Sequence, residues 1–197
     1  MAELNIFGTK HISGGTFKDI SVLGVLNADG DVHTDDLSVL GKAYFESNVF
    51  SNDVDIVGLA EIKGNLRCQN VDIIGKATIN GNVDSTKLEV VGKATVLGDV
   101  NVDQAEIVAV GSSFNNIYGD TIKFKSNPKY KGVTINSGDP VTANEIDATN
   151  ITLKNIKVKK VSGENIKILD NVEVELVEYS KSLSISRDAK IGKIVKF

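Results

Sequence analysis

The stretch from Val71 to Ala105 reads VDIIGKATINGNVDSTKLEVVGKATVLGDVNVDQA and contains one unit twice. GKATINGNV begins at Gly75, and GKATVLGDV begins 17 residues later at Gly92. The same step leads back from Gly75 through earlier glycines, which are Gly58, Gly41 and Gly24. A period this constant is the sequence signature of a solenoid rather than of an ordinary globular core.

Positions one period apart form columns, and each column keeps its size and polarity from copy to copy. One aliphatic column comprises Val22, Val39, Ile56, Ile73, Val90 and Ile107. Apolar and polar residues alternate along each unit and are interrupted by small residues, which is typical of short strands joined by tight corners. Helical solenoids need longer units with apolar residues about 3.6 positions apart. The chain is therefore predicted to be all-β, a parallel β-helix solenoid with 17-residue coils.

One corner of each coil is expected to carry an amide or a carboxylate. The corner column comprises Asp31, Asn48, Asn65, Asn82, Asp99 and Asn116. Asn and Asp tolerate left-handed backbone, and stacked amides can bond one another along the axis of a solenoid. We therefore interpret this column as structural.

The repeat divides the chain into three parts. Regular coils are expected over residues 4–121, and NIFG at the start matches SVLG at Ser21 with an offset of 16. Residues 122–145 break the pattern and contain both prolines, so they predict an irregular coil or loop. Looser coils, continuous with the first part, are expected over residues 146–197. Ten or eleven coils at about 4.8 Å each would give a rod on the order of 50 Å long.

Charge and composition exclude several functions. Residues 1–121 carry 8 basic and 17 acidic groups (−9), and residues 122–197 carry 14 and 9 (+5), which sums to the net charge of −4. With only two arginines and no basic patch interleaved with aromatic residues, nucleic-acid binding is not expected. The single cysteine excludes an internal disulfide, and Met1 leads into no signal sequence. A cytoplasmic protein is therefore expected.

No constellation of side chains predicts catalysis, a cofactor or a metal. His11 and His33 lie in different columns, and no cysteine or carboxylate cluster stands at metal-ligand spacing from either. Cys68 shares its column with small residues, so it is expected to be buried and unreactive. Ser13-Gly14-Gly15 lacks the Lys-Ser/Thr of a nucleotide-binding loop. The sequence therefore predicts no enzyme, with no catalytic, cofactor-binding or metal-binding residues.

The units GKATINGNVDSTKLEV and GKATVLGDVNVDQAEI, and the distal segment NIKILDNVEVELVEYS of Asn165 to Ser180, resemble the bactofilins, which are polymer-forming bacterial cytoskeletal proteins. The resemblance covers nearly the whole chain and is closest to longer variants with two β-helical halves. It implies a right-handed β-helix that polymerises end to end without nucleotide. The implied partners are other copies of the chain and other cytoskeletal or envelope-associated proteins. The acidic start, MAEL, argues against direct membrane binding.

Two kinds of surface are predicted to carry assembly. An open β-helix leaves unpaired strand edges and an apolar cross-section at each end. The N-terminal end is expected to present Leu4, Ile6, Phe7, Ile12 and Phe17. The C-terminal end is expected to present Leu183, Ile185, Ile191, Ile194, Val195 and Phe197.

A lateral contact is the second kind. Strict alternation turns outward the column before the first glycine, which comprises Leu23, Leu40, Val57, Ile74, Val91 and Val108. Continuous exposed apolar patches commonly mark contact surfaces. The alternative is that the column folds against its own sheet or is covered by another part of the chain.

The sequence favours a non-enzymatic scaffold protein, and two alternatives remain. A β-helical enzyme would be either polysaccharide-active, with clustered carboxylates or arginines, or acyltransferase-like, with 18-residue coils and a catalytic histidine at a subunit boundary. A β-helical binding module, such as an adhesin passenger or an ice-binding rod, would have a secretion signal or a regular Thr-x-Thr face. Electron microscopy of the nucleotide-free protein distinguishes these hypotheses.

Overall fold

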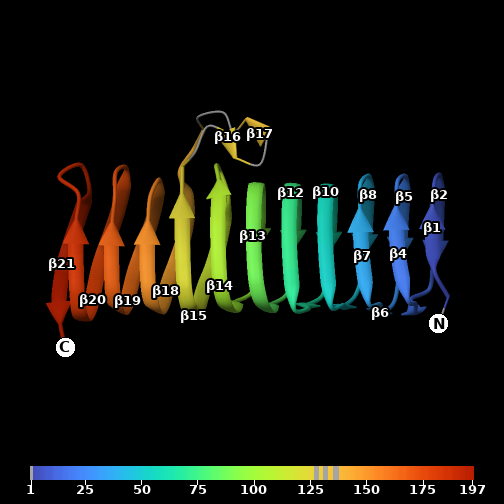
Figure 1. Cartoon of the computed structure of the whole chain (residues 1–197), viewed down its shortest axis with the longest axis horizontal. Coiled ribbons are helices and arrows are strands. Elements are labelled where there is room, and N and C mark those ends of the chain that lie inside the picture. Colours follow the sequence, from blue (N-terminus) through green and yellow to red (C-terminus); the bar gives the residue numbers. More distant parts are fainter. Residues whose placement is uncertain (1, 127–128, 131–132, 135–137) are drawn as a thin grey trace.

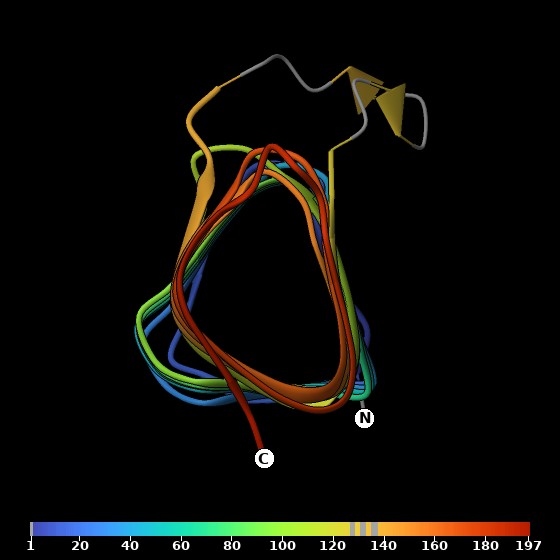
Figure 2. The same ribbon diagram turned by 90° about the vertical axis from the view of Figure 1, so that its left-hand side faces the viewer.

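The structure is a computed structural model that describes residues 2–126, 129–130, 133–134 and 138–197, without the side chains of residues 127–137. In these residues the chain forms strands and no helix, and hence no helix that is long and apolar enough to cross a membrane. The strands wind into about 11 parallel coils, with the two termini at opposite ends of a rod (Figure 1). Viewed along its axis, the rod has a triangular cross-section (Figure 2). The predicted all-β parallel solenoid is confirmed.

In the first three coils each side of the triangle is a separate strand. The first face consists of β1 (Leu4–Ile6), β4 (Asp19–Val22) and β7 (Asp36–Val39). The second face consists of β2 (Thr9–Ile12), β5 (Val25–Ala28) and β8 (Lys42–Phe45). The third face consists of β3 (Gly15–Thr16), β6 (Val32–His33) and β9 (Val49–Phe50).

From the fourth coil onward most strands continue around a corner. These are β10 (Asp53–Ile62), β12 (Asn70–Ile79), β13 (Val83–Val96), β14 (Val100–Ala109) and β15 (Ser113–Lys125), while β11 (Leu66–Arg67) is a short strand of the third face. The distal coils are β18 (Val141–Leu153), β19 (Ile156–Ile168), β20 (Val172–Ile185) and β21 (Lys190–Lys196). Two short strands, β16 (Lys129–Tyr130) and β17 (Val133–Thr134), pair antiparallel with each other.

The register of the parallel pairs follows the sequence period. Gly75 pairs with both Gly58 and Gly92, as their common column predicts. The distal coils align in the same way, since Ile166 pairs with Ile151 on one side and Leu183 on the other. Inward-facing columns fill the tube, and the column from Val22 to Ile107 is fully buried. Each such aliphatic side chain stabilises the fold by about 1.5–3 kcal/mol relative to an exposed one.

Glycine at the corner between the first and second faces is required by the distance between coils. A Cβ on Gly75 would lie 2.4 Å from the carbonyl oxygen of Gly58, and its φ is +140°. Gly92 has the same contact with Gly75 and a φ of +129°. In the distal coils Asn155 and Asn171 stand at this corner with left-handed φ values of 54° and 56°.

The amide column at the second corner bonds along the axis as expected. The Asn65 backbone N–H donates to Asn48 Oδ1 at 2.9 Å, and the Asn82 N–H donates to Asn65 Oδ1 at 2.8 Å. At the start of the column, hydrogen bonds from Ser47 and then Asn48 hold the pKa of the Asp31 carboxyl below its ordinary value. The backbone of this column is not left-handed, and its side-chain oxygens accept hydrogen bonds from N–H groups of the next coil.

The interruption in the repeat is shorter in the structure than the sequence pattern indicates. Ile122 pairs with Ala105 within β15, so regular pairing lasts until Lys125. It resumes at Val141, and Ile117 pairs with Ile146 across the gap. The chain therefore leaves the rod after Lys125 and rejoins it at Val141, and the coils on the two sides, β15 and β18, stack directly on each other (Figure 2).

Candidate assembly surfaces

The C-terminal end of the rod exposes apolar side chains. Ile194 pairs with Val177, and Ile194 is 48% exposed whereas Val177 is completely buried. Ile185 is likewise exposed although Ile168, its equivalent one coil earlier, is buried. Phe197, just beyond β21, is 69% exposed. These side chains occupy core columns or adjoin them, and they are exposed because the described part of the chain has no further coil beyond them.

The remaining residues predicted for this end divide into two groups. Leu183 and Ile191 are half-buried and pack against the core. Val195 pairs with Glu178, whose carboxylate lies 3.4 Å from the Lys160 ammonium on the outside of the rod. Val195 therefore belongs to the side of the rod and not to its end.

The N-terminal end is better closed. Leu4 and Ile6 are buried, so they are core residues and not the exposed surface that the sequence predicts. Ile12 and Phe17 are half-buried against the core, and a side chain at Gly15 would meet the Phe17 ring at 3.7 Å. The large Phe17 ring thus covers part of the cross-section. Lys10, which pairs with the buried Leu26, puts a charge at the start of a column that is apolar from Leu26 to Ala94.

The predicted lateral column is exposed over only part of its length. Leu23, Leu40 and Val57 are exposed and Ile74 is half-buried. Val91 and Val108 are buried, so the expected six-residue stripe is wrong for these two positions. These two positions are the ones closest to Lys125, the last residue of β15, with which Val108 pairs.

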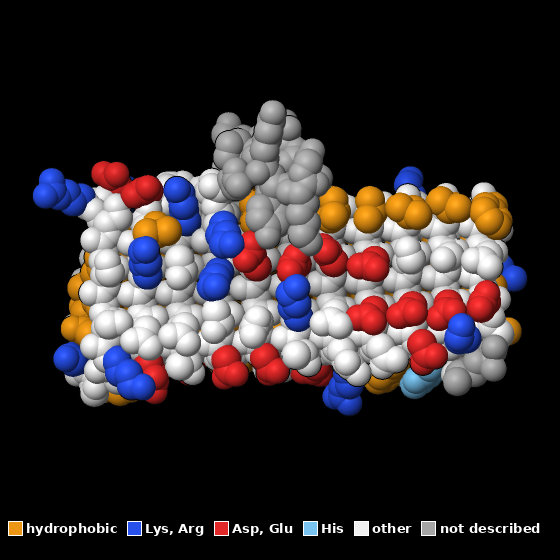
Figure 3. Space-filling model, viewed as in Figure 1, with side chains coloured by type: hydrophobic (Ala, Val, Ile, Leu, Met, Phe, Trp, Pro, Cys, Tyr) orange, Lys and Arg blue, Asp and Glu red, His pale blue; other side chains and the backbone are white. Residues whose placement is uncertain are grey.

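The column is instead extended at its other end by Phe7. The Leu23 backbone N–H donates to the Ile6 carbonyl at 2.8 Å, which aligns Leu23 with Phe7. Phe7 is 79% exposed and points from the side of the rod, although the sequence places it at the N-terminal end. We call the set of Phe7, Leu23, Leu40, Val57 and Ile74 the apolar stripe. It forms the row of apolar side chains along the upper edge of Figure 3.

Charges on the first face are sorted along the rod. One column stacks Asp19, Asp36 and Asp53 on successive coils. A second stacks Asp55, Asp72, Glu89 and Glu106 and then changes sign at Lys123. Figure 3 shows these carboxylates toward the N-terminal end and lysines toward the other end. The division of charge between the two parts of the sequence is thus visible on a single face.

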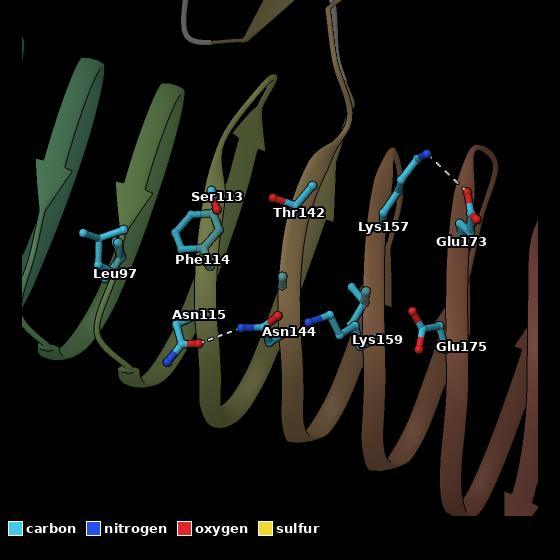
Figure 4. Close-up of a pocket in the computed structure, with 13 residues that line it drawn as sticks. Leu97, Ser113, Phe114, Asn115, Thr142, Asn144, Lys157, Lys159, Glu173 and Glu175 are labelled. Carbon is cyan, nitrogen blue, oxygen red and sulfur yellow. Dashed lines mark hydrogen bonds and ion pairs between the residues drawn. The ribbon is translucent and has the colours of Figure 1, made fainter.

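A shallow groove of about 410 Å³ lies on the second face (Figure 4). The short side chains of Ser113 and Thr142 lie between Leu97 on one side and Lys157 on the other. Asn144 Nδ2 donates to Asn115 Oδ1 at 2.7 Å along the same wall. Sequence reasoning missed the groove because its small residues come from β15 and β18, which are 29 positions apart where these asparagines meet. The lining can donate hydrogen bonds and offers neither a histidine nor a cysteine.

Two lysines of the distal coils, Lys157 and Lys160, are paired with glutamates of neighbouring coils. Lys157 Nζ lies 3.4 Å from Glu173, and Lys160 Nζ lies 3.0 Å from Glu145 and 3.4 Å from Glu178. Hydrogen bonds to these two glutamates, first to Glu145, raise the pKa of the Lys160 ammonium above its ordinary value. These side chains stabilise the stacking of the distal coils.

The histidines are also accounted for by coil contacts. The His11 ring nitrogen Nε2 lies 2.7 Å from an Asp29 carboxylate oxygen, and the His33 ring stacks on Phe50 with centroids 4.5 Å apart. Both histidines are exposed. Over the described residues, no three or more His, Cys, Asp or Glu side chains are grouped so that they could hold a metal ion.

Comparison with known proteins agrees with this architecture. Residues 18–118 match the family model of the bactofilins, described as polymer-forming cytoskeletal proteins. The matched segment is just over half of the 197-residue chain and includes both GKAT units and most of the apolar stripe. No curated protein and no solved structure matches the chain. Its coils, its register and this match show that the chain belongs to the bactofilin family of polymer-forming cytoskeletal proteins.

Proposed function

We propose that this protein is a cytoplasmic scaffold subunit that assembles end to end without nucleotide and has no active site. The observation that carries the proposal is the uncovered C-terminal coil, where Ile194 is 48% exposed in a column that is otherwise buried. The family's description as polymer-forming supports self-association, and its description as cytoskeletal supports a structural role. The free Cys68 suits a reducing compartment.

Stacking at the ends would repeat the contacts that hold the rod together. Each internal coil buries its apolar columns against the next coil and pairs its backbone with it. A second subunit placed on β21 would supply both kinds of contact to Ile185, Ile194 and the exposed backbone edge. Neither contact needs a bound phosphate, which is why the proposal includes no nucleotide.

Assembly is tested with purified protein in nucleotide-free buffer containing EDTA, by light scattering and negative-stain electron microscopy. Filaments or end-to-end oligomers are expected, and added ATP or GTP should leave the scattering unchanged. A stable monomer at tens of micromolar contradicts the proposal.

Ile194→Arg tests the end surface directly. A charge at this exposed core position should raise the protein concentration needed for filaments by about tenfold or more, because burying an unpaired charge is costly. Leu97→Arg is the matched control, since Leu97 is 59% exposed on the second face, away from both ends. Circular dichroism should show the same β-rich spectrum for both variants. Equal assembly of Ile194→Arg and wild type would show that β21 is not the contact.

A further inference from the structure

The strand at the N-terminal edge of the second face carries a lysine on its inner side. Lys10 in β2 pairs with Leu26, and Ile12, two residues further on, packs against the core. Paired residues of neighbouring strands point to the same side of a sheet, and residues two apart in a strand share that side. The Lys10 side chain therefore begins in the inner column that Leu26 continues, yet it is exposed at the end of the rod.

The column behind Lys10 is closed to water and to charge. Leu26 is completely buried, and the buried positions that follow it are all alanine, namely Ala43, Ala60, Ala77 and Ala94. A charge is tolerated in such a column only where nothing covers it, because burying an ammonium without a partner costs more than burial of its aliphatic stem gains.

Lys10 has no carboxylate of its own to accompany it under a cover. Lys18, the next lysine along the chain, lies 3.5 Å from Glu3 and 3.1 Å from Asp19. His11, beside Lys10, contacts Asp29 at 2.7 Å. Lys10 makes no ion pair with a residue that the structure describes. A subunit placed over the first coil would thus have to remove water from an uncompensated ammonium.

Neither end of a second copy is rich in the carboxylates that would compensate it. Residues 186–197, at the C-terminal end, contain one acidic residue, Asp188, and four basic ones, which are Arg187, Lys190, Lys193 and Lys196. A copy joined through its own N-terminal end would bring a second Lys10 to the joint. In both arrangements like charges approach each other, and like-charge contacts at an interface cost binding energy.

We propose that Lys10 is a gatekeeper of the N-terminal end, whose charge weakens the docking of a second copy of this chain on β1, β2 and β3. The inference rests on the end-to-end assembly proposed above, because it concerns the strength of that contact. Natural sheet proteins use charges on the inner side of an edge strand to prevent uncontrolled pairing of edges. Lys10 fits this use by its column, its exposure and its lack of a described counter-charge.

The expected consequence is assembly that is reversible. A weakened joint raises the protein concentration at which filaments form. Variants of one interface differ mainly in their dissociation rates, so the charge should also let subunits leave a filament end faster.

Lys10→Met tests the gatekeeper, because methionine keeps a flexible unbranched stem and removes the charge. The protein concentration needed for filaments should fall about tenfold, as followed by light scattering over a dilution series. Filaments of this variant should also survive dilution longer than wild-type filaments. Lys10→Arg keeps the charge and should assemble as the wild type does. Lys76→Met is the matched control, since Lys76 is exposed on the outside of the rod, away from both ends.

An unchanged concentration for Lys10→Met, or an equal fall for Lys76→Met, overturns the gatekeeper. A higher concentration overturns it too, because Lys10 would then attract an acidic group of the second copy. Filaments of Lys10→Met under conditions where the wild type stays monomeric would support the gatekeeper while refuting end-to-end assembly of the wild type. Absence of filaments from both proteins would refute both proposals.

Salt separates the charge of Lys10 from its shape. Repulsion between exposed charges is screened beyond about 10 Å at 0.1 M salt. Added sodium chloride should therefore strengthen the assembly of the wild type more than that of Lys10→Met. Circular dichroism should show the same β-rich spectrum for all variants. The same salt dependence for the two proteins would show that the charge of Lys10 does not act at the joint.

Discussion

Cys68 occupies a column in which polar groups are bonded between coils. The Thr34 hydroxyl donates at 2.9 Å to the Lys18 carbonyl, and the Ser51 hydroxyl donates at 2.9 Å to the Asp35 carbonyl. A thiol is a weaker donor, and at this position it serves as a small buried group. Burial, followed by the charges of Asp53 and Asp84, raises the pKa of the Cys68 thiol to about 12.

Thiol reagents should therefore leave Cys68 unlabelled in the native protein near pH 8, because the thiolate is the reactive form and it is scarce there. Labelling should become rapid after denaturation, as followed by mass spectrometry. Leu97→Cys supplies an exposed thiol as a positive control in the same fold. Rapid modification of native Cys68 would show that its column is open to solvent.

Asp36 lies between Asp19 and Asp53 in a column of carboxylates. Burial, and then the charges of these two neighbours and Asp35, raise the pKa of the Asp36 carboxyl above its unfolded value of 3.8. The ionised form is thus disfavoured in the folded state. The ionised Asp36 carboxylate therefore destabilises the folded state most at pH values above the raised pKa. This destabilisation disappears as the pH falls below 3.8.

Asp36→Asn should accordingly raise the melting temperature at pH 7 and have little effect at pH 3. Thermal unfolding followed by circular dichroism at the two pH values measures the difference. Asp103→Asn, at an exposed position outside this column, is the control and should change neither temperature much. An equal gain at both pH values would assign the effect to something other than charge.

At the scale of the strands, the glycine corner limits how closely coils can stack. Gly75→Ala would place a Cβ 2.4 Å from the Gly58 carbonyl oxygen at a φ of +140°. We expect the free energy of unfolding to fall by about 3 kcal/mol, through overpacking and backbone strain together. Urea unfolding measures the change. Gly8→Ala is the matched control, because nothing lies within 4 Å of its added Cβ, and a similar loss there would mean that close stacking is not the cause.

The strands and their register could be predicted because each coil repeats the environment of the previous one. Ile56 and Ile73, for example, occupy equivalent positions in successive coils and are both aliphatic. Features that depend on contacts outside the repeat could not be predicted from the sequence. Ile122 belongs to a regular strand although the repeat after it is interrupted. Val91 and Val108 are aliphatic like Leu23 and Leu40 and stand in the same column, yet they are buried while those two leucines are exposed.

At the scale of the whole rod, the two ends differ more than the sequence indicates. Both ends have aliphatic and aromatic residues, and sequence reasoning treats them alike. Only the structure shows that Leu4 and Ile6 are buried while Ile194 is exposed. The sign change along the first face could be predicted in part, since the uneven charge division is in the sequence, but its position in a single column of stacked residues could not.

The departure of the chain from the rod at Lys125 and its return at Val141 leave the stacking of β15 on β18 intact. The length of the segment between these points is therefore not fixed by the packing of the coils. A fluorescent domain or an epitope spliced into this segment would travel with the subunit while both termini stay native. For a molecule whose ends are proposed to join, that offers a way to follow assembly in living cells without obstructing the joints.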